Sequence, residues 1–381
     1  MIKGNPYKNN QLYSVGIEEE YMLCNPNTGD LVNKADLIMD SIDNISNAGL
    51  VEIKKRFSYE LILSEIETNT SVCSNVTDAI KEVSLLRKIL RDLGENHNYR
   101  LGISGTHPTA NPNKQSFVQN DSYKWVRSKM KEYARQNMTF STHIHIGVNN
   151  PELMIKISNA ARCWIAPLLA ISVNSPFFNN VMTGMQSSRT FQFGNFPRTN
   201  IPSYINDIND YTNIIDSLKS SNSIDKPRHI WWKIRPHIDF GTIEFRMCDA
   251  QRSLLRVEML AAICQSLVHA INTSIDKGEC IEDFNLEFLN DGLWSAASEG
   301  ISGKIINPLD NKVVTMKEYI NTMLDFIHPS LLYFGNENII NLVNNILQDN
   351  TESQKQLDFF NKNDIEHLKL FLMDDVEYDY K

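Results

Sequence analysis

The chain has 381 residues, of which 42% are hydrophobic and 22% are charged, and its formal net charge is −9. This is enough apolar material for one large globular core or two ordinary ones. The acidic balance gives a pI of about 5.5, and the sequence has no basic stripe. These features argue against a nucleic-acid partner and against attraction to an anionic membrane surface.

Neither a secretion signal nor a membrane span is predicted. The first ten residues are polar, and the longest apolar run, residues 163–173, is too short to cross a bilayer and contains Pro167. Six cysteines form no CxxC pair, and five of them lie in apolar surroundings. Free buried thiols are typical of a reducing compartment, so we expect a soluble cytoplasmic protein.

Strand-like and helical segments follow one another at uneven lengths. Extended structure is predicted over the first 25 residues and over 51–73, 99–107, 139–148 and 230–248, the last a strand pair centred on Gly241. Helices are predicted over 34–48, 76–96, 122–136 and 151–173, then a loop-rich stretch at 175–203 and a mostly helical part from about 251. Ser74 or Asn75 can cap the second helix. Residues 373–381 have the composition of a solvated acidic tail. This order favours an α+β fold over a doubly wound parallel sheet.

Three consecutive glutamates occupy an otherwise apolar segment, GIEEEYML. Alternation along a strand places Glu18 and Glu20 on one face and Glu19 on the other, which is largely apolar and is expected to pack under helices. On that side Glu19 is expected to find a salt bridge or solvent. Two neighbouring carboxylates repel each other unless a cation lies between them, so Glu18 and Glu20 indicate a divalent metal ion. Solvated glutamates on an edge strand are the alternative.

Two further strands repeat this alternation. His143 and His145 share one face in FSTHIHIGV, and Glu244 and Arg246 share one face in GTIEFRMCD. Histidines at this spacing can ligate a metal ion or can be hydrogen-bonded core residues. An acid beside a guanidinium can be a plain ion pair, or the two can hold a nucleotide phosphate together with a cation.

The segment YELILSEIETNT adds Glu60, Glu65 and Glu67. Glu60 and Glu67 have opposite parity, so the strand must break near Ser64 if both are to face one site. Solvated acids are the alternative, above all for Glu65.

Three arginines stand in unusual company, Arg189 in SSRTF, Arg198 in NFPRTN and Arg235 in WWKIRPH. Trp231 and Trp232 beside Arg235 predict a stacked, partly buried guanidinium. Each arginine could receive a phosphate or a carboxylate, whereas surface salt bridging is the default for any one of them.

Several familiar chemistries are missing from the sequence. It contains no GxxxxGK[ST], GxGxxG or GxSxG motif, and no cysteine has the surroundings of a nucleophile. The acids, with a little imidazole, suit Mg²⁺ or Mn²⁺ better than zinc. Acids, metal ions and arginines in one cleft match phosphoryl transfer from ATP, where the protein positions groups and neutralises charge.

The motifs, in this order, resemble those of the bacterial carboxylate–amine ligases, relatives of glutamate–cysteine ligase. The matching stretches run from GIEEEYMLCNPNTGDL through ELILSEIETNTSVC, GISGTHP, STHIHIGV and SSRTFQFGNFP to WWKIRPHIDFGTIEFRMCDA, and they cover residues 16–250. The resemblance implies one catalytic domain over 1–381 with a fold similar to the catalytic domain of glutamine synthetase. That fold is a curved, mainly antiparallel sheet with helices packed on its outer face.

The resemblance also implies a reaction and a set of residues. ATP would phosphorylate a carboxylate, by analogy the γ-carboxylate of glutamate, and an amine would attack the acyl phosphate to give an amide. Metal-ligand positions of the family fall on Glu18, Glu20, Glu60, Glu67, His145 and Glu244, with His143 on the same strand face. We expect His145 rather than His143 to touch metal.

The arginines are assigned in the same way. Arg246 is similar to the family's phosphate-contacting arginine, and Arg189 and Arg235 are similar to arginines that line the substrate region. Arg198 is a further candidate for cofactor binding. Glu18, Glu20, Glu244 and Arg246 then form the catalytic set, with ATP and Mg²⁺ as cofactors.

Two rival functions remain at this point. A small-molecule or guanidino kinase could use the same metal–ATP cleft, and a nucleotide-binding protein could lack turnover. A ligase needs both a carboxylate and an amine for ADP release, whereas a kinase needs one acceptor. The expected partners are amino-acid and amine substrates, with no nucleic acid and no membrane, and a homodimer is left open. The sequence identifies neither the amine nor its general base.

Overall fold

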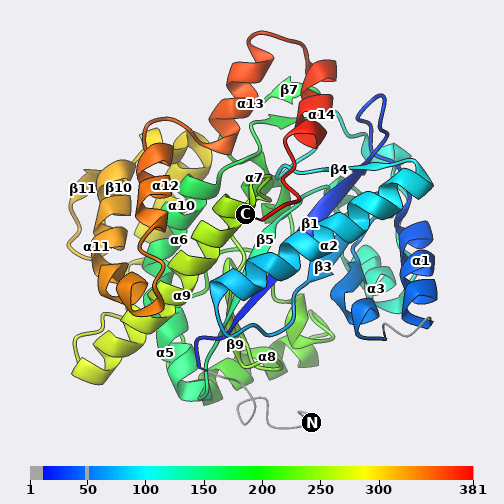
Figure 1. The fold of residues 1–381 in the computed structure, drawn as a ribbon. Helices are drawn as coiled ribbons and strands as arrows, with labels where there is room; N and C mark the ends of the chain where they lie inside the picture. Colours follow the sequence, from blue (N-terminus) through cyan, green and yellow to red (C-terminus); the bar gives the residue numbers. More distant parts are fainter. Residues whose placement is uncertain (1–11, 48–50, 381) are drawn as a thin grey trace.

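A mainly antiparallel sheet organises the protein, whose computed structural model describes residues 12–47 and 51–380. The strand order is β2-β3-β1-β5-β9-β8, and β4 pairs with the C-terminal end of β1. Every pairing in this sheet is antiparallel. The strands are β1 Val15–Cys24, β2 Phe57–Tyr59, β3 Glu65–Asn69, β4 Arg100–Gly102, β5 Thr142–Gly147, β8 Ile234–His237 and β9 Thr242–Phe245. The predicted antiparallel sheet is thus confirmed, with β1 at its centre (Figure 1).

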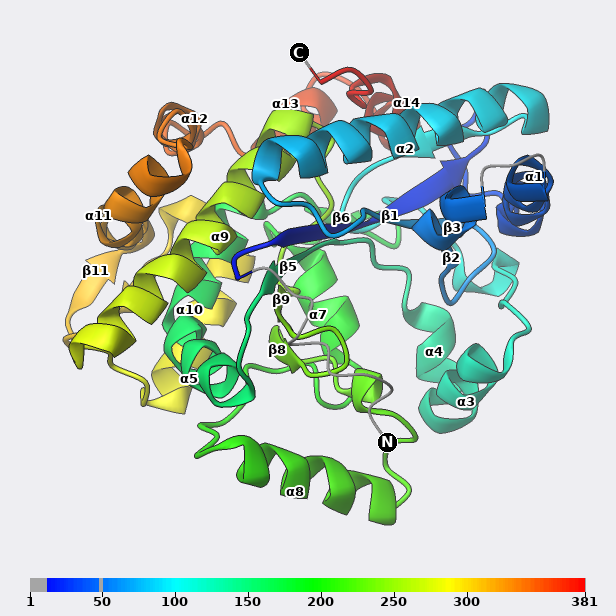
Figure 2. The same ribbon diagram turned by 60° about the horizontal axis from the view of Figure 1, so that its bottom comes forward.

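Two long helices cover one face of the sheet, α2 Val76–His97 and α9 Leu254–Lys277 (Figure 2). Their apolar sides meet the strand positions that alternate with the polar ones, among them Ile17, Tyr21 and Ile144, which are all buried. Asn75 caps α2 by accepting a hydrogen bond from the backbone N–H of Asp78, which decides between the two predicted caps.

Smaller helices lie on the opposite side of the sheet (Figure 2). These are α3 Asp121–Met130, α4 Glu132–Gln136, α7 Ser188–Gly194 and α8 Ile208–Ser220. A hairpin of β6 Phe177–Phe178 and β7 Val181–Met182 precedes α7. The 175–203 stretch, predicted to be rich in loops, therefore contains a short helix.

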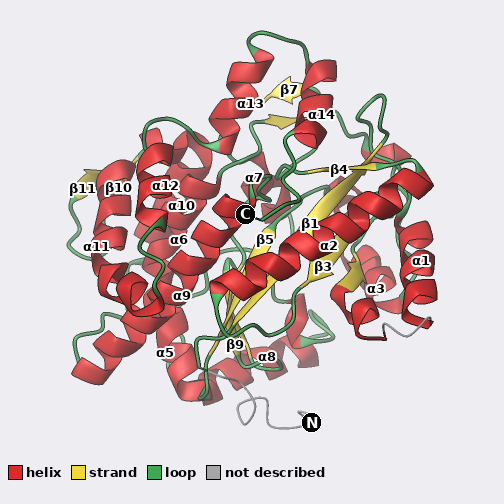
Figure 3. Cartoon of the chain, in the orientation of Figure 1, coloured by secondary structure: helices red, strands yellow, loops and turns green. Residues whose placement is uncertain are grey.

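The chain beyond β9 is mostly helical, as predicted (Figure 3). Its helices are α9, α10 Leu286–Glu299, α11 Met316–Phe334, α12 Ile339–Ile346, α13 Glu352–Phe360 and α14 Ile365–Asp374, with a hairpin of β10 Lys304–Ile306 and β11 Val313–Thr315. Helices α10 and α11 pack on α9 and on the earlier helix α6, Ile165–Ser172, rather than on the sheet. Two earlier helices complete this layer, α5 Pro151–Ala161 and α6 Ile165–Ser172, and α1 Ala35–Asn47 lies beside β2.

Several predicted elements are shorter or broken. The predicted extended segment 51–73 begins as a 3-10 helix, Val51–Arg56, and 99–107 is a strand only at Arg100–Gly102. The helix predicted at 122–136 breaks at Lys131, whose φ is 53°. The helix predicted at 151–173 breaks at a 3-10 turn, Arg162–Trp164, and Pro167 then falls in the first turn of α6, where its missing N–H costs least.

The acidic C-terminal stretch is not a solvated tail. Glu377 accepts a hydrogen bond from the backbone N–H of Leu254, at 2.7 Å, and so caps α9, while Val376 is buried. The backbone carbonyl of Glu377 accepts a hydrogen bond from Arg87 of α2, at 2.9 Å. These partners lie far away in sequence, so composition alone could not reveal them.

Within residues 12–47 and 51–380, two helical segments, Pro151–Ser172 and Leu254–Lys277, are long and apolar enough to cross a membrane by length and composition alone. In the folded protein, 94% and 83% of their most apolar stretches are buried, as is common for the core helices of folded proteins. All six cysteines are free, and five are buried, as predicted.

Candidate functional site

The polar face of the sheet forms one wall of a cavity of about 570 Å³. Strands β1, β3, β5 and β8 contribute to it, and α3 and α7 close its other side. Its polar lining includes Glu18, Glu20, Glu60, Glu65, Glu67, Ser141, His143, Arg189, Arg228, His229, Arg235, His237 and Arg246. Most of the acids, imidazoles and arginines singled out in the sequence therefore meet in one place.

Strand register brings these side chains together. Glu20 lies opposite Glu67, Glu18 opposite His143, and His145 opposite Glu244. Glu244 in turn lies opposite Arg235. Residues directly opposite each other in an antiparallel pair project from the same face, so these polar positions form one patch on a single face of β3, β1, β5, β9 and β8.

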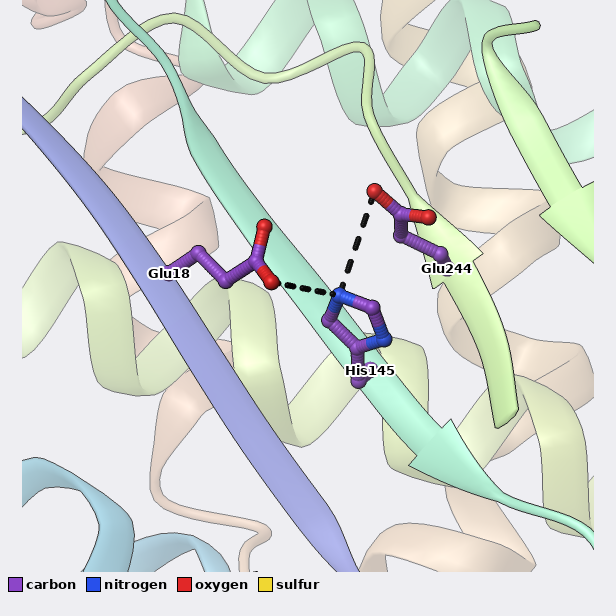
Figure 4. A group of neighbouring side chains, drawn as sticks. All are labelled: Glu18, His145 and Glu244. Carbon is purple, nitrogen blue, oxygen red and sulfur yellow. Dashed lines mark ion pairs between the residues drawn. The ribbon is translucent and has the colours of Figure 1, made fainter. Parts of the chain in front are cut away.

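Glu18, His145 and Glu244 form the first group that could hold a metal ion (Figure 4). The Nε2 atom of His145 lies 3.3 Å from Glu18 Oε1 and 3.8 Å from Glu244 Oε1, and it has no hydrogen-bond partner although it is buried. The other ring nitrogen, Nδ1, lies 2.9 Å from Thr242 Oγ1, which orients the ring. A free buried nitrogen aimed between two carboxylates fits a metal ligand.

Glu20, Glu60 and Glu67 form the second such group, with one oxygen from each within 4.8 Å of the others. Burial and the neighbouring carboxylates raise the pKa of Glu60 and of Glu67 well above the usual range. The predicted break between Glu60 and Glu67 is present, because β2 ends at Tyr59 and β3 begins at Glu65. Close acids that repel one another in this way fit a divalent cation with oxygen ligands, Mg²⁺ or Mn²⁺.

His143 belongs to neither group. Its Nδ1 lies 3.2 Å from Glu18 Oε2, and its Nε2 lies 2.7 Å from the hydroxyl of Ser141. Burial, followed by the nearby Arg246, lowers the pKa of His143. The ring thus links the two acidic groups, while His145 has the free nitrogen.

Ser141 is a site residue that the sequence reasoning missed. Its backbone N–H and its hydroxyl donate hydrogen bonds to the same oxygen of Glu20, at 2.7 and 2.6 Å. The available signal was parity, because Ser141, His143 and His145 alternate along one stretch.

Glu244 is completely buried between two arginines. Burial alone would raise the pKa of Glu244, but the guanidinium groups of Arg235 and Arg246 hold it well below the usual range. Arg235 Nε lies 2.5 Å from Glu244 Oε2, and Arg246 donates to the other oxygen. Burial likewise opposes ionisation of Glu18, yet His145 and a hydrogen bond with His143 lower the pKa of Glu18.

The two other arginines are placed differently. Arg189 lines the cavity and is buried, and it donates to the backbone carbonyls of Met247 and Arg246, both at 3.1 Å. Arg198 is not among the lining residues. Its guanidinium lies over the ring of Trp231, 5.8 Å from the centroid, and donates to two backbone carbonyls. The arginine stacked beside the tryptophan pair is thus Arg198, whereas Arg235 is engaged by Glu244.

Glu65 is a cavity residue rather than a solvated acid. Its side chain is buried, and burial together with Glu20 and Glu67 raises its pKa well above the usual range.

Aromatic residues form another wall of the cavity, which the sequence did not predict. It consists of Tyr123, Phe193, Phe196, Trp231 and Phe240. Beside it, the ring of His229 stacks on the ring of Trp125, with 3.9 Å between the ring centroids. These residues come from separate loops and helices, and no local sequence pattern joins them.

The fold and the site together define a ligase that joins an acid and an amine by a carbon–nitrogen bond, as comparisons with known proteins show. A family model, "Glutamate-cysteine ligase family 2(GCS2)", matches residues 14–370. The chain belongs to this family.

Curated relatives agree with this assignment over nearly the whole chain. A Solibacter usitatus protein, named provisionally as a glutamate–cysteine ligase 2, is 31% identical over 366 residues, which are 96% of this chain and 94% of that protein. A Herpetosiphon aurantiacus protein of the same provisional name is 30% identical and covers 91% of this chain and 88% of its own length.

Solved structures confirm the predicted fold class. The glutamate–cysteine ligase of Francisella tularensis, solved in complex with AMP, has a TM-score of 0.71 and 12% identity, and the match covers 96% of this chain and 89% of that one. The ligase PafA, solved in complex with the prokaryotic ubiquitin-like protein Pup, has a TM-score of 0.55 and 11% identity, with coverage of 97% and 73%. At these identities the likeness concerns the fold alone.

Proposed function

We propose that the protein is an ATP-dependent carboxylate–amine ligase that works in the cytoplasm through an acyl-phosphate intermediate. The proposed donor is the γ-carboxylate of glutamate or of a similar amino acid. The observation that carries this proposal is the pair of acidic groups on the polar face of the sheet, where Glu18, Glu20, Glu60 and Glu67 line one cavity with Arg246. The provisional names of the relatives and the AMP in the Francisella structure support ligation and nucleotide use.

Each acidic group has a proposed role. Glu18, His145 and Glu244 would hold one divalent cation, and Glu20, Glu60 and Glu67 a second. Mg²⁺ bound there would screen the repulsion between an anionic carboxylate and the polyphosphate of ATP. His143 and Ser141 keep Glu18 and Glu20 in place by hydrogen bonds.

Arg246 is the proposed contact of the transferring phosphoryl group. It lines the cavity, and the negative charges of Glu244, Glu18 and Glu20 raise its pKa against the effect of burial, so it stays charged. Arg235 holds Glu244 from the other side and so fixes the position of that carboxylate. A preorganised guanidinium stabilises charge that develops on the phosphoryl oxygens.

The reaction needs no protein nucleophile. A carboxylate oxygen attacks the γ-phosphorus, the bond to the bridging oxygen of ATP breaks, and ADP leaves. The amine nitrogen then attacks the acyl carbon, phosphate leaves, and the nitrogen loses one proton. This agrees with the buried state of the five cysteines in the core, whose thiols are not placed for attack.

An ADP-release screen tests the proposal. Glutamate and other carboxylates are paired with a panel of amino acids and amines, and the products are identified by mass spectrometry. We expect ADP release that requires both partners, with an amide of the combined mass. Release with a single acceptor and a phosphorylated product would instead identify a kinase, and ATP binding without release under any mixture would identify a nucleotide-binding protein.

A further inference from the structure

Lys233 is a cavity-side residue of the sheet that the proposed chemistry does not use. The N–H of Arg246 donates to the carbonyl of Lys233, at 2.9 Å, which extends the β8–β9 pairing one step beyond Ile234 and Phe245. Because alternate residues share a face, Lys233 projects from the same face as Arg235 and lies across from Arg246.

The ammonium group of Lys233 is buried without a hydrogen-bond acceptor. The residue is 3% exposed, and its Nζ has no hydrogen-bond acceptor. Burial, followed by the positive charges of Arg189 and Arg246, lowers the pKa of Lys233 to about 7, while Asp249 acts in the opposite direction. A buried cation with no acceptor costs free energy, so a ligand anion would relieve a cost that the free protein carries.

The groups around Lys233 do not fully compensate its positive charge. Asp249 is already occupied, since it accepts hydrogen bonds from the N–H of Asn174 and from the hydroxyls of Ser175 and Ser187, at 2.8 to 2.9 Å. Arg189 lies 3.9 Å from the same carboxylate. Asp249 thus acts on both Arg189 and Lys233, but its oxygens are already in use by these donors.

Lys233 is close to the open cavity. Phe193 lines the cavity, and its ring centroid lies 5.5 Å from the Nζ of Lys233 and 5.8 Å from the Cζ of Arg189. Arg189 and Arg246 line the cavity as well. A carboxylate that enters beside this ring comes within reach of the ammonium, because the lysine stem is long and flexible.

Strand register sets Lys233 apart from the acids that would carry the cations. Glu244 lies opposite Arg235, two positions along the strand from Lys233, and Glu18 lies opposite His143 on the other side of β9. Residues directly opposite each other in an antiparallel pair, such as Lys233 and Arg246, have Cβ atoms about 4.5 to 5.5 Å apart. A short dicarboxylic acid could thus place one carboxylate at Arg246 and the other at Lys233.

We propose that Lys233 is a specificity-determining residue that, together with Arg189, binds the carboxylate of the donor that does not react. This inference rests on the proposed ligase function and narrows the donor to dicarboxylic amino acids. L-Glutamate is such a donor, whereas 4-aminobutyrate is the same molecule without the α-carboxylate.

Equilibrium binding tests this role without turnover. The dissociation constants of glutamate, 4-aminobutyrate and ATP are measured by calorimetry for the wild-type protein and for Lys233→Met. We expect the wild type to prefer glutamate over 4-aminobutyrate, and the preference to fall by roughly 10- to 150-fold in the variant, the range for a lost hydrogen bond to a charged group. The affinity for ATP should stay unchanged.

Controls separate a binding role from a structural one. Lys233→Arg keeps the charge and should restore most of the preference, and Lys304→Met removes an exposed lysine of β10 and should change nothing. Thermal unfolding checks that each variant is folded, with Lys233→Gln as the substitute if Lys233→Met is not. A wild type that binds both ligands equally, or a preference that Lys233→Met leaves intact, overturns the proposal.

Kinetics distinguish the donor from the acceptor. In the ADP-release reaction, Lys233→Met should reduce the ratio of kcat/KM for glutamate over 4-aminobutyrate and leave the ratio for cysteine over cysteamine unchanged. A change confined to the second ratio assigns the lysine to the acceptor and contradicts the proposal. Failure of the ligase function itself would show separately, as absent amine-dependent ADP release in the wild type.

Discussion

The two faces of β1 carry the same residue type for different reasons. On the helix side, Glu19 is 2% exposed and meets Arg87 of α2 through two hydrogen bonds, at 2.7 and 3.0 Å. Tyr21 donates a third hydrogen bond to it. The remaining donors of Arg87 reach backbone carbonyls, so the protein itself balances this charge completely.

On the cavity side, the cationic side chains of the protein do not balance the negative charges of the carboxylates. Glu20 lies opposite Glu67, and Glu60 and Glu65 lie nearby. Burial and the negative charges of neighbouring carboxylates raise the pKa values of Glu60, Glu65 and Glu67. The difference teaches that Glu19, which is paired with Arg87 away from the cavity, stabilises structure, whereas the crowded carboxylates on the cavity face indicate a cation supplied from outside.

The largest expected effect concerns catalysis on the cavity side. Glu20→Gln and Glu244→Gln each remove a charge from one acidic group, and we expect ADP release to fall by about 10²- to 10³-fold or more. Coupled-enzyme assays at saturating Mg²⁺ and ATP measure the change. Glu337→Gln, on an exposed turn, is the matched control. Turnover near the wild-type rate in both cavity variants would remove the basis for the metal-site assignment.

The next effect concerns stability on the helix side. Glu19→Gln leaves Arg87 buried without a counter-charge, and we expect the free energy of unfolding to fall by about 3 to 5 kcal/mol. Urea unfolding followed by circular dichroism measures it. A loss below about 1 kcal/mol, the size expected of a surface pair, would contradict the structural role of this ion pair.

The stabilisation of the protein by Mg²⁺ should depend on pH because of the acids on the cavity side of the sheet. The folded-state pKa values of Glu60 and Glu67 lie above their unfolded values, so their stabilising contribution is present below the unfolded pKa and is lost as pH rises through the folded pKa. Mg²⁺ binds the deprotonated acids, so we expect it to raise Tm more at about pH 8 than at about pH 5. Differential scanning fluorimetry with and without Mg²⁺ checks this, and equal shifts at both pH values would argue against the carboxylates as ligands.

The smallest effect concerns the hydrogen bonds behind the ligands. Ser141→Ala removes the hydroxyl that bonds Glu20 and His143, and we expect about a tenfold loss of activity, the lower end for partners of metal ligands. The apparent KM for Mg²⁺ should rise in the same variant. Ser217→Ala, on the exposed side of α8, is the control. An unchanged KM for Mg²⁺ would show that Ser141 does not act through Glu20.

Alternation along the strands made much of the site predictable. Glu18, Glu20, His143, His145 and Glu244 share faces because a strand repeats every two residues, and the structure places them on one wall. The break before Glu65 followed from the same parity argument. Family resemblance then supplied the fold, which no pattern within the sequence specifies.

Long-range partners could not be predicted. Arg87 lies 68 residues from Glu19 on a helix whose pattern reports only its apolar face, and nothing in the pattern of Lys233 shows that Arg189 and Phe193 come near it. Arg198 over Trp231 shows the same limit, since adjacency in sequence pointed to Arg235 instead. Strand period reports which face a residue takes, whereas its neighbours across the cavity depend on packing.

Adjacent glutamates offer the most direct test of the central claim, that the acids in excess in the cavity serve to bind cations. Calorimetric titration with Mn²⁺ is carried out on the wild type, Glu20→Gln and Glu19→Gln, each confirmed to be folded. We expect Glu20→Gln to weaken Mn²⁺ binding by about tenfold or more and Glu19→Gln to leave it unchanged. Equal affinity of Glu20→Gln and the wild type, or an equal loss in both variants, would contradict the account.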